Sequence, residues 1–125
     1  MMPATDYFEA LVLSHAIHQQ PFSIEDWYVG LWTSDPTSAG ILTGEVAAAD
    51  YIRKPVIFNT VFANLAAIEW ANAVNDWGEV NNVCLINSPQ KGSGNMLIYQ
   101  PRDLLDVNPG IQVVIPAGGL TVALI

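Results

Sequence analysis

Residues 95–124 of the chain read NMLIYQPRDLLDVNPGIQVVIPAGGLTVAL. Apolar and β-branched residues gather here in short runs, and turn-forming residues separate the runs. Asn108, Pro109 and Gly110 are typical of a tight turn, and residues 116–119 provide a second one. Short apolar runs bounded by such turns indicate β-strands. We therefore predict strands at residues 95–100, 103–107, 111–115 and 120–124.

The same pattern continues upstream, where we predict four more strands. They lie at residues 27–33, 54–58, 66–70 and 79–87. Residues 66–77 are also compatible with a short helix, because several alanines accompany Ile68 and Trp70. Eight short strands with turn-rich connections are typical of an antiparallel β-sandwich. The predicted fold class is therefore mostly β and jelly-roll-like.

One helix is predicted, at residues 5–19. Phe8, Leu11, Val12 and His15 recur with the spacing of one helical face, and Pro21 is expected to end the helix. Residues 34–50 are rich in small side chains and read as a long loop, a place where binding functions often lie. We predict one domain over residues 1–125, with residues 1–20 as an N-terminal helical arm.

The composition is unusual for a domain of 125 residues. Hydrophobic residues make up 51% and charged residues only 13%, whereas about 25% charged residues is typical. Burial of part of the surface against partner chains would explain the deficit. The net charge is −8, with only four basic residues. We therefore expect no binding to nucleic acids or to anionic membranes.

No pattern in the sequence points to catalysis. His15 and His18 have helical spacing but no third metal ligand nearby, and no nucleophile-elbow motif is present. Cys84, the only cysteine, sits in an apolar run and is expected to be a buried hydrophobe. We expect no enzyme activity, no metal and no cofactor. The beginning of the sequence has no signal-peptide pattern, and no apolar run is long enough for a membrane span.

The four tryptophans leave one alternative open. Aromatic platforms can bind sugars, so a carbohydrate-binding module is a competing interpretation. We favour their burial in the core or in an interface, where aromatic side chains supply much of the buried area.

Five blocks of the sequence resemble, in order and spacing, a family of small virion proteins of tailed phages that is usually labelled a tail fibre protein. They are residues 5–15 (TDYFEALVLSH, beside DYLE…LLDH), 30–37 (GLWTSDPT, beside ALFTSDPT), 45–56 (EVAAADYIRKPV, beside EVSGGGYARQAV), 77–83 (WGEVNNV, beside WGTVTHV) and 116–124 (PAGGLTVAL, beside PAGGLTVTL). The chain departs from the family at residues 47–50, which replace a glycine-rich stretch, and at Asn81 and Asn82.

The resemblance implies a structural protein of the virion, made in the cytoplasm of the bacterial host. Because the repeats or heptads of a fibre shaft are missing, we expect a capsid cement or decoration protein that stabilises the particle. A tail fibre or baseplate component is the alternative. The expected partners are the major capsid protein or tail proteins of the same phage, and further copies of this chain, by analogy as a trimer. The candidate interface residues are Phe8, Leu11, His15, His18, Trp32, Asp35 and Pro36.

Overall fold

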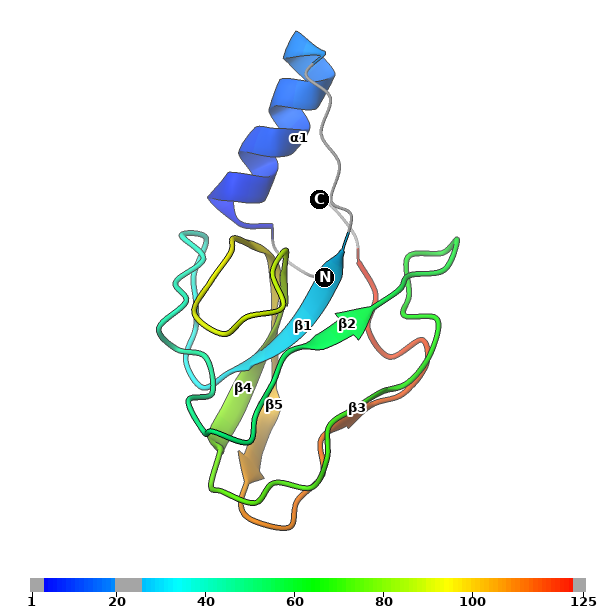
Figure 1. Ribbon diagram of the computed structural model, residues 1–125. Helices are drawn as coiled ribbons and strands as arrows, with labels where there is room; N and C mark the ends of the chain where they lie inside the picture. The colour runs from blue at the N-terminus through cyan, green and yellow to red at the C-terminus, as the bar shows by residue number, and fades with distance from the viewer. Residues whose placement is uncertain (1–3, 20–25, 123–125) are drawn as a thin grey trace.

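The computed structural model describes residues 4–19 and 26–122, and these form one helix and six strands (Figure 1). The elements, in chain order, are α1 (Asp6–His18), β1 (Trp27–Trp32), β2 (Lys54–Val56), β3 (Ile68–Glu69), β4 (Gly78–Ile86), β5 (Met96–Val107) and β6 (Val114–Ile115). One antiparallel sheet has the strand order β2-β1-β4-β5, and β3 and β6 form a second, two-stranded antiparallel sheet. The prediction of a mostly β, antiparallel fold with one N-terminal helix is confirmed.

The central strands of the larger sheet are buried on both faces. Val29 and Leu31 of β1 point into the main core, whereas Trp32 points into a smaller cluster on the opposite face. The other fully buried members of that smaller cluster are Cys84, Ile86 and Met96. Strands covered on both faces read as continuous apolar runs, which explains why β1 and β4 lack a polar alternation. The predicted burial of Cys84 is confirmed.

Strand β5 is longer than the sequence predicts. Two strands were expected on either side of Pro101, but Met96–Val107 forms one strand along β4. The register between the two strands shifts opposite Val80 and Asn82, next to Pro101. β5 lies at the edge of its sheet, and an edge strand with a bulge tolerates a proline that cannot donate a ladder hydrogen bond. The predicted break is therefore wrong.

The predicted jelly roll is not what the described residues form. A jelly roll has eight strands in two sheets, whereas six strands are observed, in sheets of four and two. No helix forms at residues 66–77, where Ile68–Glu69 pairs with Val114–Ile115. Thr121 makes an isolated bridge to Ala63, and residues 123–124 of the last predicted strand lie outside the described part. At this end of the chain the backbone pairing is short, with the Asn64 amide donating to the Leu120 carbonyl at 3.0 Å and the Val122 amide to the Phe62 carbonyl at 2.8 Å. The side chain of Asn64 adds to it, since its Oδ1 accepts from the Leu120 amide at 2.9 Å.

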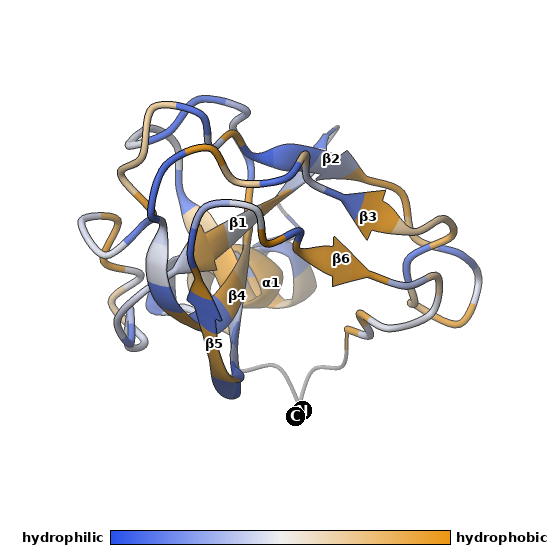
Figure 2. Cartoon of the chain, turned by 90° about the horizontal axis from the view of Figure 1, so that it is seen from below, coloured by the Kyte–Doolittle hydropathy of each residue, from blue (hydrophilic) through white to orange (hydrophobic). Residues whose placement is uncertain are grey.

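Both sheets contribute to one main core. Strands β3 and β6 lie side by side (Figure 2); Ile68 of β3 and Ile115 of β6 are buried, whereas Glu69 of β3 is exposed. Ile68 and Ile115 reach the same cluster as Val83 and Leu85 of β4. Burial of these side chains is the main favourable term for a domain of this size.

The first turn of α1 belongs to that core. Thr5 caps the helix, because its Oγ1 accepts from the Phe8 amide at 3.3 Å, and Thr5 Oγ1 itself donates to the Met96 carbonyl at 2.6 Å. Phe8 is only 7% exposed. Later turns extend away from the sheet (Figure 1), and there Leu13 and Ile17 are 56% and 67% exposed. The helix ends where Gln19 adopts a left-handed conformation; Pro21 lies outside the described residues.

We predict that Phe8→Ala lowers the free energy of unfolding by about 3–5 kcal/mol, because it opens a cavity in the core. Leu13→Ala is the matched control on the exposed side of the same helix and should change stability by less than about 0.5 kcal/mol. Urea denaturation measures both. Equal small effects would mean that the helix is a detachable arm.

Candidate functional site

A buried ion pair organises one end of the molecule. The side chains of Arg53 and Glu45 are 0% and 5% exposed. Arg53 Nε lies 2.9 Å from Glu45 Oε2, and Arg53 Nη2 lies 2.8 Å from Glu45 Oε1. The two groups therefore meet as a bidentate fork, the strongest geometry for a hydrogen-bonded ion pair.

The remaining donors of Arg53 hold the loop at residues 88–94. Its Nη1 donates to the carbonyls of Ser88 and Ser93, both at 2.9 Å. The Gly92 amide donates to Glu45 Oε1 at 3.4 Å. The guanidinium also lies 6.0 Å from the ring centroid of Trp32, within range of a cation–π contact. The ion pair thus fixes a loop that is distant in sequence.

Tyr51 extends this network to β1. Its hydroxyl donates to Glu45 Oε2 at 2.7 Å and accepts from the Leu31 amide at 2.9 Å. Burial, together with the neighbouring Glu45 carboxylate, raises the pKa of Tyr51 well above its usual value. The phenol therefore stays protonated and keeps donating to Glu45.

Gly30 makes room for these groups. A methyl group at this position would lie 2.6 Å from the Trp32 ring and 3.0 Å from both Glu45 Oε2 and the Tyr51 hydroxyl. A larger residue here would push the network apart.

The loop at residues 34–50 folds back over the second face of the larger sheet. Trp32 Nε1 donates to the Ile41 carbonyl at 2.9 Å. The Thr33 amide donates to Gly44, and the Val46 amide donates to Leu31. The loop predicted from the sequence is therefore an ordered cover for the smaller core cluster.

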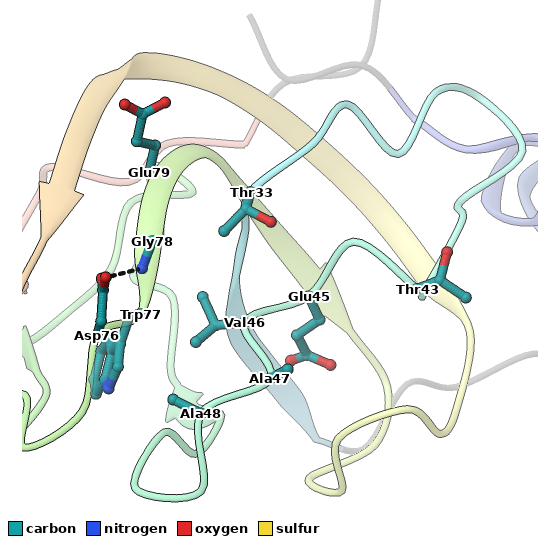
Figure 3. Close-up of a pocket in the computed structure, with 10 residues that line it drawn as sticks. All are labelled: Thr33, Thr43, Glu45, Val46, Ala47, Ala48, Asp76, Trp77, Gly78 and Glu79. Carbon is teal, nitrogen blue, oxygen red and sulfur yellow. Dashed lines mark hydrogen bonds between the residues drawn. The ribbon is translucent and has the colours of Figure 1, made fainter.

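A hollow of about 550 Å³ lies beside this loop (Figure 3). Its lining includes three carboxylates, but they do not converge. Glu45 is held by Arg53, Asp76 accepts from the Gly78 amide at 3.0 Å, and Glu79 points away from the other two. Paired-carboxylate chemistry needs two such groups facing one cleft, so the hollow does not support it. Among the described residues, no group of three or more His, Cys, Asp or Glu is placed to hold a metal.

Asp50 ties the turn at residues 72–77 to the same end of the molecule. Its carboxylate accepts from the Val74 amide at 2.7 Å, from Asn75 Nδ2 at 2.9 Å and from Trp77 Nε1 at 3.1 Å. These hydrogen bonds, led by that from Val74, hold the pKa of Asp50 well below its usual value. The carboxylate is a structural acceptor.

The seven predicted interface residues do not form one surface. Phe8, Trp32 and Pro36 are buried, and Leu11 is half-buried against the core. His15, His18 and Asp35 are exposed, and Asp35 accepts from the Thr37 amide at 2.9 Å to close a turn. The helix and the 34–50 loop do adjoin, since the Asp6 amide donates to Ser38. Partner contact by the exposed residues stays a prediction.

The four tryptophan side chains pack against the interior of the protein. Trp32, Trp70 and Trp77 are buried, which confirms the prediction that they fill the interior. Trp27 is half-buried and makes edge contacts with Phe8 and Phe58, with ring centroids 5.9 and 6.0 Å apart. Three of the four are buried and Trp27 is half-buried against two other rings, so the geometry does not favour the sugar-binding alternative.

Sequence reasoning missed the ion pair. In the sequence, Glu45, Tyr51 and Arg53 were noted only as part of the block at residues 45–56, and no role was assigned to them. Separately, none of the described helices has the length and apolarity to cross a bilayer.

We predict that Arg53→Met destabilises the protein by about 3–5 kcal/mol, because it leaves the Glu45 carboxylate buried without a partner. Glu45→Gln should cost a similar amount. The double variant should lose less than the sum of the two, as expected for groups in direct contact. Arg102→Met, at an exposed cation, is the control and should stay within about 0.5 kcal/mol. Additive single effects in urea denaturation would contradict the coupling.

The lowered pKa of Asp50 predicts a pH effect. The stabilisation by this carboxylate is complete above its ordinary value of 3.8 and is lost as the pH falls through the folded-state pKa. Asp50→Asn should therefore be less stable than wild type at neutral pH, and the gap should narrow below pH 3.8. Asp103→Asn, on exposed β5, is the control. Thermal unfolding at a series of pH values measures this, and a constant gap would refute it.

Among curated proteins, none matches this sequence. The family described as podophage GP4 fiber I protein gp80 matches residues 3–123, almost the whole chain. This match supports a structural component of a phage virion and agrees with the resemblance in the sequence. The chain belongs to the family of the podophage GP4 fiber I protein gp80.

Proposed function

We propose that the chain is a structural component of the tail fibres of a tailed phage and acts by binding other virion proteins, without catalysis. The observation that carries this proposal is the family match over residues 3–123, because it covers the helix, both sheets and both ordered loops. The match favours the tail fibre alternative over the capsid cement expectation. The partners in this proposal are tail proteins of the same phage.

The fold suits a junction or an end of a fibre better than its shaft. A shaft is built from repeats or coiled-coil heptads, whereas the described residues form two small sheets around one core. The loops at residues 34–50 and 88–94 are tied down by the Arg53–Glu45 pair. A rigid surface loses little conformational entropy on binding.

The outer turns of α1 are the proposed attachment surface. Leu13 and Ile17 are exposed and lie four residues apart, on one face of the helix. Between Glu9 and the end of the helix no Asp, Glu, Lys or Arg occurs. An exposed apolar helix face is the feature that docks into a groove of a partner.

We predict that Leu13→Gln with Ile17→Gln leaves the fold intact and lowers incorporation into particles roughly tenfold or more, since two apolar anchors are lost. Deletion of the helix is a poorer test, because it also removes Thr5 and Phe8 from the core. Val74→Gln, at another exposed apolar residue, is the control. Incorporation is measured by complementing a phage that lacks the gene; normal incorporation of the double variant would exclude α1 as the attachment surface.

The copy number per particle separates the two virion hypotheses. Quantitative mass spectrometry of purified phage gives the ratio of this chain to the major capsid protein. A tail fibre component should be present in a handful to a few dozen copies, because the tail offers few attachment points. Hundreds of copies, or a simple fraction of the capsid protein, would mean a capsid cement protein.

A further inference from the structure

The charges of this protein are unevenly distributed. Its twelve acidic and four basic side chains all lie outside residues 55–68 and 107–122. These two segments are joined in space by the β3–β6 pairing and by the bridge between Ala63 and Thr121 (Figure 2). We call residues 55–68 and 107–122 the charge-free lobe. Two charged residues lie at its rim: Arg102, whose Nη2 donates to the Gly119 carbonyl at 3.1 Å, and the exposed Glu69, which pairs with Val114.

The charge-free lobe exposes large apolar side chains. Six of them are between 41% and 73% exposed: Ile57, Val61, Phe62, Leu65, Ile111 and Val114. Single exposed apolar residues are normal on a protein surface. A group of them on a lobe without charges is instead typical of a protein-binding surface.

Phe62 is the most unusual of these residues. Its φ of 62° is in the left-handed region, which is unfavourable for a bulky side chain. Its ring is also 65% exposed. Both the backbone conformation of Phe62 and the exposure of its apolar ring to water are therefore unfavourable. Residues in such a conformation persist only where the surrounding structure holds them, and they cluster at functional sites.

The loop that carries Phe62 is held rigidly. Asn59 Oδ1 accepts from the Val61 and Ala63 amides at 3.0 and 3.1 Å, and the Phe62 amide donates to the Asn59 carbonyl. Asn64, only 1% exposed, donates through Nδ2 to the carbonyls of Ala66 and Pro116. The backbone that carries Phe62 is therefore held in place, and binding would order little besides the Phe62 side chain.

The same lobe contains an apolar groove of about 180 Å³. Its lining consists of Pro55, Val56, Ile57 and residues 65–68. The Leu65 amide donates to the Ile57 carbonyl at 2.8 Å and fixes its two walls relative to each other. An exposed aromatic ring and an apolar groove thus occur within one lobe.

We propose that the charge-free lobe binds a second copy of this chain, with Phe62 of one copy entering the 55–57/65–68 groove of the other. A chain with a net charge of −8 repels its own copies, and contact through this lobe places the fewest like charges at the interface because residues 55–68 and 107–122 contain none. A lobe with both an exposed ring and an apolar groove can be self-complementary, as an interface between identical subunits requires. The proposal concerns the chain itself and does not rest on its place in the virion.

Two variants test the two halves of the contact. Phe62→Asn removes the ring, and Asn suits a positive φ, so the loop should fold as well as before. Ala67→Trp fills the groove with an exposed residue of its lining. Leu104→Asn, at a residue 60% exposed on the charged strand β5, is the control.

Sedimentation velocity of the purified full chain, up to about 100 µM, gives the readout, since weak specific interfaces associate in that range. We expect wild type and Leu104→Asn to form a discrete oligomer, and Phe62→Asn and Ala67→Trp to shift at least tenfold towards monomer with unchanged thermal unfolding. A monomeric wild type would overturn the proposal. An oligomer that survives both lobe variants would overturn it as well.

Discussion

The buried ion pair between Arg53 and Glu45 fixes how one end of this molecule is built. Three segments that are distant in sequence meet on it: β1 through Tyr51, the loop at residues 34–50, and the loop at residues 88–94. Burying two charges costs desolvation energy that their attraction repays only with good geometry. Here both oxygens of Glu45 and all three nitrogens of Arg53 are bonded. The pair therefore selects one loop arrangement, because any other would leave a buried charge unpaired.

The two ends of the molecule differ in how they are held together. Around Arg53 the loops are held by polar contacts and the sheet is covered on both faces. On the charge-free lobe, apolar side chains remain exposed, and hydrogen bonds of the Asn59 and Asn64 side chains hold the backbone. A surface with few charges gives a protein low solubility on its own. Contact with other proteins in a virion would cover such a surface.

Local patterns predicted the elements whose causes are local. The helix at residues 5–19, the strands β1 and β4, and the burial of Cys84 follow from periodicity, caps and apolar runs. Elements whose causes lie elsewhere in the chain were missed. Pro101 continues β5 because the strand is at an edge, the described part of the last predicted strand pairs only through an isolated bridge between Thr121 and Ala63, and the Glu45–Arg53 pairing depends on loops that close in three dimensions. A left-handed Phe62 has no sequence signal at all.

The position of the protein in the particle tests most directly whether the chain is a tail fibre component. Electron microscopy of intact virions labelled with gold-conjugated antibody fragments against the purified chain shows that position directly. The account predicts label confined to the tail, and absent from virions whose copy of the gene is deleted. Label spread evenly over the capsid would contradict it and restore the cement interpretation.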